Sequence, residues 1–163
     1  MRTGYIKMVL KIRPQSPQPV QELLQDPYLI DGRKINMRFY ILVICNNSNI
    51  SVYAYNNGFM YYTAEKFTTD TQEFGPNITT GYIDRNVYEH NPLTLEDFRK
   101  YLDSNRQLTD AEQAILRNTT MRLSSVIFIR IYTMLRDVFM ACAPRICTGD
   151  KLKSAITFQL LYA

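Results

Sequence analysis

The stretch QDPYLIDGRKINMRFYILV, residues 25–43, decides the fold because a basic, turn-forming loop leads directly into an apolar strand. Asp31-Gly32 is a turn signal, since glycine readily adopts the positive φ angles that other residues resist. The eight residues 37–44 are almost wholly apolar, as a strand covered on both faces requires. The sequence therefore predicts a buried strand whose entrance carries Lys34 and Arg38.

Two interpretations of these cations are open. Arg33 and Lys34 can be solvated loop charges, with Arg38 capping the end of a strand, because charged side chains are usually exposed. Alternatively, they hold a phosphate or a carboxylate, since lysine supplies a compact charge and arginine a planar fork for bidentate contact. The spacing of the cations does not choose between a solvated surface and an anion site.

The amino-acid sequence of this region resembles that of the tubulin-tyrosine ligase-like family of ATP-grasp ligases. Family members carry a pattern close to VQxYIxNPLLIDGRKFDxRxYVLV, and residues 20–43 read VQELLQDPYLIDGRKINMRFYILV. Residues 53–58 (YAYNNG) and 63–67 (TAEKF) are similar to the family's YxYxxG and ATEKY. The main resemblance covers residues 18–67, and FQLL at residues 158–161 is a weaker echo of the family's FELF.

The resemblance implies ATP-dependent carboxylate–amine ligation. Family members use ATP and magnesium to form an acyl phosphate, then couple an amino acid, usually tyrosine, glutamate or glycine, to tubulin. Cations offset the negative charge of the triphosphate and of the intermediates in such a reaction. The resemblance places Gln21 beside the adenine, and Lys34 and Arg38 at the phosphates or the acceptor. The nucleotide- or substrate-binding residues that it implies are Gln21, Lys34, Asn36, Arg38 and Thr79.

Several positions depart from the family pattern. Asn36 replaces an Asp, Tyr61 replaces an Arg, and of the family's HLTN only Thr79 is retained, within NITT at residues 77–80. We expect one partial domain over residues 1–163, without the family's upstream glycine-rich strand and downstream metal-ligand segment. No catalytic residue or metal ligand is assigned. A degraded ligase, with ATP and Mg²⁺ as cofactors if active, and a catalytically inactive fragment or binding module both remain open.

Composition and charge limit the kinds of protein that this chain can be. A chain of 163 residues that is 46% hydrophobic is long enough for one folded domain. Three cysteines, without metal-ligand spacing or an even disulfide set, predict free buried thiols and a cytoplasmic location. The net charge of +4 suits an acidic partner such as tubulin, or reflects an ordinary solvated surface. We expect no nucleic-acid partner, because no such motif is present.

The pattern of elements predicts an α+β fold, an ATP-grasp-like partial lobe in which an antiparallel β-meander packs against a long C-terminal helix. Strands are expected at residues 37–45, 50–55 and 59–64, with a hairpin at Asn56-Asn57-Gly58. Residues 1–13 predict a strand and residues 14–19 a loop. Residues 68–93 predict a long loop with one short strand near 78–83, and residues 152–161 a last strand.

Helices are predicted from their capping signals. A helix should begin after Thr94 and end near residue 103, and the capping box of Thr109 and Glu112 should open a second helix that continues to about residue 140, before Pro144. An apolar stripe marks the buried side of this second helix: Leu123, Val126, Ile127, Ile131, Met134, Leu135 and Val138. Charged residues interrupt the stripe, so a core helix rather than a membrane span is expected.

Overall fold

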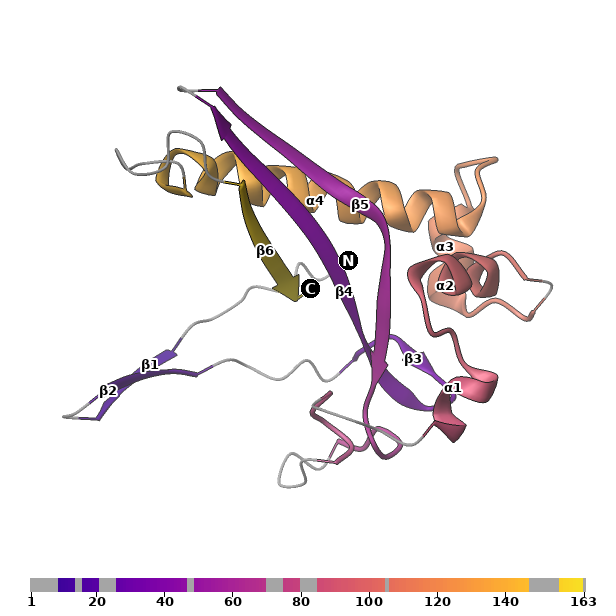
Figure 1. The fold of residues 1–163 in the computed structure, drawn as a ribbon. Helices are drawn as coiled ribbons and strands as arrows, with labels where there is room; N and C mark the ends of the chain where they lie inside the picture. Colours follow the sequence, from indigo (N-terminus) through magenta and orange to yellow (C-terminus); the bar gives the residue numbers. More distant parts are fainter. Residues whose placement is uncertain are drawn as a thin grey trace.

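The computed structural model describes residues 9–13, 16–20, 26–46, 49–69, 75–79, 85–104, 106–146 and 156–162. Both strands and helices are present, so the predicted α+β class is confirmed. The elements, shown in Figure 1, are β1 (Val9–Arg13), β2 (Ser16–Val20), β3 (Leu29–Ile30), β4 (Arg33–Asn46), β5 (Asn49–Tyr62), α1 (Asn86–His90), α2 (Leu95–Leu102), α3 (Asp110–Leu116), α4 (Leu123–Ile146) and β6 (Ile156–Tyr162).

An antiparallel sheet is built around the long strand β4. Strands β3, β4 and β5 follow one another as neighbours, and β6 also pairs with β4, over residues 38–44. The β4–β5 hairpin closes where Asn46 pairs with Asn49. The antiparallel pairing and the last strand are therefore confirmed, but the strands predicted at 50–55 and 59–64 are one strand, and residues 152–155 of the predicted last strand lie outside the described residues.

The predicted hairpin at Asn56-Asn57-Gly58 is wrong, because β5 continues through these residues. The register against β4 shifts there: Gly58 pairs with Phe39, whereas Ala54 pairs with Ile41. A Cβ atom on Gly58 would lie 2.1 Å from the carbonyl oxygen of Arg38. The glycine thus permits two backbones to approach closely at a bulge, which is another use of the residue type that marks turns.

The proline-rich segment after β1 forms β2 and not the predicted loop. Pro17 and Pro19 pair with Ile12 and Leu10 in a two-stranded antiparallel ladder. Proline is tolerated in an edge strand where its missing N–H faces away from the partner, and two prolines two residues apart share one side of the ladder. The β1–β2 hairpin lies apart from the larger sheet (Figure 1).

Both predicted capping boxes are confirmed. The side chains of Thr94 and Thr109 accept hydrogen bonds from the backbone N–H groups of Asp97 and Glu112, and each acid bonds back to the N–H of its threonine. These reciprocal bonds satisfy donors that the first turn of a helix leaves unpaired. They explain why α2 and α3 begin where the sequence predicts.

The prediction of one helix over residues 110–140 is wrong, because α3 ends at Leu116 and α4 begins at Leu123. The start of α4 is set by a distant residue: Asp103, at the end of α2, accepts hydrogen bonds from the backbone N and the Oγ of Ser124, at 3.0 and 2.7 Å. The helix also passes Pro144 and ends at Ile146. A proline so close to the end of a helix affects only its last turn.

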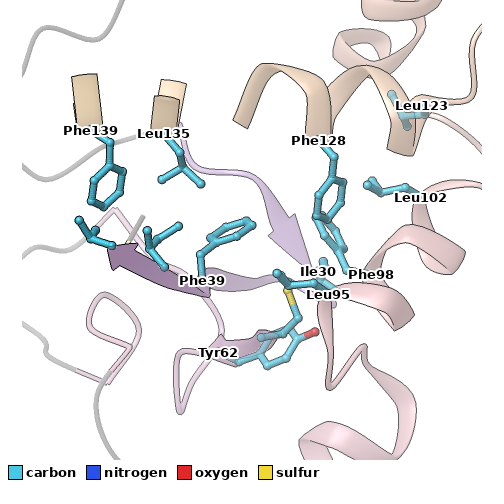
Figure 2. Packing of buried hydrophobic residues seen from close by; sticks show 13 residues of the cluster. Ile30, Phe39, Tyr62, Leu95, Phe98, Leu102, Leu123, Phe128, Leu135 and Phe139 are labelled. Atoms are coloured by element: carbon cyan, nitrogen blue, oxygen red, sulfur yellow. The ribbon is translucent and has the colours of Figure 1, made fainter. Parts of the chain in front are cut away.

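The core lies between the sheet and the helices α2 and α4. In Figure 2, Leu135 and Phe139 reach from α4 toward Phe39 on β4, and Phe128 lies beside Phe98 of α2. The buried apolar side chains are Ile30, Phe39, Ile41, Val43, Met60, Tyr62, Leu95, Phe98, Leu102, Leu123, Phe128, Leu135 and Phe139.

The buried side of α4 is rotated by about one residue from the predicted stripe. Phe128 and Phe139 are buried, and Tyr132 packs edge-to-face on Phe39 with ring centroids 6.2 Å apart. Met134 and Val138, predicted to be buried, are exposed instead, by 48% and 44%. Aromatic rings bury the largest apolar areas, so their positions decide which side of the helix faces the sheet.

Two further features differ from the predictions: the segment that connects β5 to α2, and the thiol of Cys142. Ile78 and Thr79 are not in a strand, and residues 80–83 of the predicted strand lie outside the described residues. The short helix α1 was not predicted. Cys142 is free and exposed, which corrects the prediction of a buried thiol there. Within the described ranges, every helix is too short or too polar to cross a membrane.

Candidate anion-binding site

The side chains of β4 alternate between two faces of the sheet. Phe39 and Ile41 are buried on the face that packs against the helices. Because successive strand residues point to opposite sides, Lys34, Asn36 and Arg38 all lie on the other face, spaced by about 6–7 Å along the strand. The two predicted cations and the predicted amide thus share one surface, which we call the cationic face.

The turn before β4 fixes the start of this face. Asp31 and Gly32 both have positive φ, 50° and 71°, and reverse the chain between β3 and β4. The Gly32 carbonyl accepts a hydrogen bond of 2.7 Å from the backbone N–H of Phe67. The turn predicted from Asp31-Gly32 is confirmed, and it is held against the segment 63–67.

Lys34 is buried, with 7% of its surface exposed, so the interpretation as a solvated charge is wrong for this residue. Its backbone N–H donates to Thr63 Oγ1 at 3.2 Å, and its Nζ lies 4.8 Å from the centre of the Phe67 ring. No carboxylate among the described residues forms an ion pair with it. Burial lowers the pKa of the Lys34 ammonium below its usual value.

Asn36 and Arg38 continue the face along β4. The Arg38 guanidinium lies 4.4 Å above the Tyr61 ring, in cation–π contact. Tyr61 pairs directly with Asn36 across the strands. The Oδ1 atom of Asn36 is buried and accepts no hydrogen bond from any residue that the structure describes. A buried acceptor without a donor is uncommon and costly, and a ligand N–H or O–H would satisfy it.

Arg33 has a structural role that the sequence reasoning missed. Its Nη1 donates to the carbonyl oxygens of Thr63 and Ala64, at 3.0 Å for Thr63. These bonds hold the segment that carries Phe67 over the start of β4. The similarity of TAEKF to a family motif signalled that this segment matters, but it did not reveal the contact with Arg33.

Of the two remaining predicted site residues, the structure describes only Thr79. Gln21 lies outside the described residues. Thr79 is described and partly buried, and it lies in an irregular segment. Its segment contacts the one that carries Phe67 at Gly75, whose carbonyl accepts a 3.4 Å hydrogen bond from the backbone N–H of Glu65.

A second buried charged group lies at the start of α3 and is fully paired. Arg106 binds both carboxylate oxygens of Glu112, and the Tyr28 hydroxyl donates to the same carboxylate at 2.7 Å. Burial favours a high pKa for Glu112, but hydrogen bonds from Arg106, Thr109 and Tyr28 outweigh it and lower the pKa to about 2. We call these residues the Glu112 network; it joins the loop before β3 to α3.

The chemistry of the cationic face suits an anionic ligand. Lys34 and Arg38 supply two positive charges on one surface, and the amide of Asn36 between them can donate to an anionic oxygen. These groups fit phosphates or a carboxylate. For Mg²⁺, no group of three His, Cys, Asp or Glu side chains is gathered within the described part of the chain, so we assign no residue to a metal.

Comparison with known proteins identifies the family. A profile of the tubulin-tyrosine ligase family matches residues 5–117. Over 90 residues the chain is 29% identical to a probable tubulin polyglutamylase of Rattus norvegicus, TTLL9, and over 89 residues it is 24% identical to the inactive polyglycylase TTLL10 of Homo sapiens. These matches span 52% and 51% of this chain, but only 19% and 13% of the two relatives. The chain belongs to the tubulin-tyrosine ligase family.

Proposed function

We propose that the cationic face binds the phosphates of ATP, or an anionic acceptor, in an ATP-dependent amino-acid ligase that modifies tubulin in the cytoplasm. The observation that supports this most strongly is Lys34, a residue with 7% of its surface exposed whose ammonium faces a ring and no carboxylate among the described residues. Arg38 and Asn36 lie on the same side of β4. The family membership supports the choice of ATP over other anions.

In this proposal each residue has a separate role. Lys34 and Arg38 offset the charge of the triphosphate or of an acyl phosphate, which is the main catalytic requirement of phosphoryl transfer. Asn36 orients the ligand, donating through its amide and accepting through the buried Oδ1. Gln21 beside the adenine and Thr79, as a further nucleotide- or substrate-binding residue, complete the proposed binding set. Bound Mg²⁺ would supply further charge compensation at the phosphates.

Equilibrium dialysis of the full chain against radiolabelled ATP with Mg²⁺ tests this proposal. The wild-type chain should bind, and the double variant Lys34→Met/Arg38→Met should lose most of the binding. Lys100→Met is the matched control, because Lys100 is an exposed cation on α2 that pairs with Glu96 away from this face. Equal affinity in the wild type and the double variant would contradict the proposal.

One observation favours a second candidate, a nucleotide-binding module without ligase activity. Tyr61 stands where the family has an arginine, and its neutral ring lies beneath Arg38, so one cation of the family pattern is missing. One relative is itself described as inactive. Under this candidate the chain transfers no labelled tyrosine, glutamate or glycine to tubulin with Mg-ATP. Robust transfer that disappears in Lys34→Ala would exclude it.

A further inference from the structure

The outward side of α4 carries apolar side chains that no described element covers. Ile129 is 53% exposed, and Met134 and Val138 lie beside it on the surface. An open groove of about 620 Å³ follows this side; it is lined by Ile129, Arg130, Thr133, Met134, Asp137, Val138 and Ala141. We call these residues the outer strip. Single exposed apolar residues are ordinary, but a continuous strip is typical of an interaction surface.

The charges of the outer strip are self-complementary. Arg130 and Asp137 are seven residues apart, which places them on the same side of the helix, about 10 Å apart along its axis. The midpoint between them falls between Thr133 and Met134. If a second α4 runs antiparallel across a twofold axis at that midpoint, each Arg130 lies level with Asp137 of the other copy. A parallel pair would instead place like charges together, which is unfavourable.

The contacts that Arg130 and Asp137 already make do not prevent these side chains from pairing with a second copy of the chain. Arg130 forms no ion pair with any residue that the structure describes. Asp137 contacts Arg136 at 3.0 Å, but both side chains are largely exposed, and such surface pairs contribute little. The small side chains of Thr133 and Ala141 allow the two helices to approach to about 8–10 Å.

We propose that the outer strip binds a second copy of this chain, by antiparallel pairing of α4 with α4. The apolar side chains supply the buried area, and the two Arg130–Asp137 pairs set the direction. The surface lies on the side of α4 that faces away from the sheet, so the proposal is independent of anion binding at Lys34 and Arg38.

Sedimentation equilibrium of the full chain over a range of concentrations tests the proposal. The wild type should form dimers, and Arg130→Asp and Asp137→Arg should each weaken association at least tenfold. The double variant R130D/D137R exchanges the charges and should restore the wild-type affinity. Both residues are exposed, so at a concentration where the wild type is monomeric, thermal unfolding of each variant should match the wild type, which separates lost association from lost folding.

Three outcomes would overturn the proposal. The first is a wild-type chain that stays monomeric at about 100 μM, because a dimer this weak would not be specific. The second is a dimer that is insensitive to both single substitutions, which would place the interface elsewhere. The third is failure of R130D/D137R to restore the association that the single substitutions weaken.

Discussion

Glu112 and Lys34 are both buried charged residues, with 2% and 7% of their surfaces exposed, but they differ in what surrounds them. Glu112 receives hydrogen bonds from Arg106, Thr109 and Tyr28, whereas Lys34 faces the Phe67 ring. A buried charge that the protein pairs internally supports the fold. A buried charge whose ionic partner is absent costs stability, and such groups concentrate at functional sites.

The largest expected effect follows from breaking the Glu112 network. Glu112→Gln leaves the Arg106 guanidinium without its carboxylate and should lower the free energy of unfolding by about 3 kcal/mol. Urea denaturation measures this loss. Exposed Glu96, which pairs with Lys100 on α2, is the matched control, and Glu96→Gln should change the stability by less than about 0.5 kcal/mol. Equal losses of stability in the two variants would contradict the claim that the buried Glu112 network stabilises the fold more than a surface ion pair does.

The next effect concerns the close approach that holds β5 against Arg38. Gly58→Ala places a Cβ against the Arg38 carbonyl and should cost about 2 kcal/mol by overpacking. Gly75→Ala is the control, because the atoms nearest to the added one belong to the flexible carboxylate end of Glu65. A Gly58→Ala chain as stable as Gly75→Ala, by the same denaturation measurement, would show that the bulge is not required.

The two buried charges should each make stability rise with pH, Glu112 in the acid range and Lys34 in the alkaline range. The pKa of Glu112 is about 2 in the fold against an ordinary value of 4.5, so its contribution is present above about pH 5 and is lost as the pH falls toward 2. The pKa of Lys34 is lower in the folded chain than in the unfolded chain, so on raising the pH the folded chain loses this proton before the unfolded chain does. Stability therefore rises with alkaline pH until the pH reaches the ordinary lysine pKa of 10.5. Thermal melting across pH should lose the acid-range dependence in Glu112→Gln and the alkaline-range dependence in Lys34→Met. Persistence of either dependence in its variant would assign it to other groups.

Local interactions explain what the sequence predicts correctly. The capping boxes at Thr94 and Thr109 involve residues three apart, and the turn at Asp31-Gly32 depends on two adjacent residues. The strand predicted over residues 37–45 is also found, but β4 begins earlier, at Arg33, so Lys34 lies in the strand on the same side as Arg38 and not in the predicted loop.

The features that were missed depend on distant residues. The hydrogen bond between Tyr28 and Glu112 joins positions 84 apart in the chain, and the break between α3 and α4 depends on Asp103 of α2. The burial of Lys34 requires the segment carrying Phe67, and the bulge at Gly58 arises from its pairing with β4. Patterns in a single sequence do not contain these contacts.

The central claim is that Lys34 is kept buried for a ligand and not for the fold. Isothermal titration of ATP into the wild type, Lys34→Met and Lys100→Met, with urea denaturation of the same three proteins, tests it most directly. We predict that Lys34→Met binds ATP about 10- to 100-fold more weakly than the wild type and is at least as stable, because it removes a charge that pairs with no carboxylate in the described part of the chain. Lys100→Met should bind as the wild type does. Undiminished ATP binding by Lys34→Met, with a loss of stability, would contradict the claim.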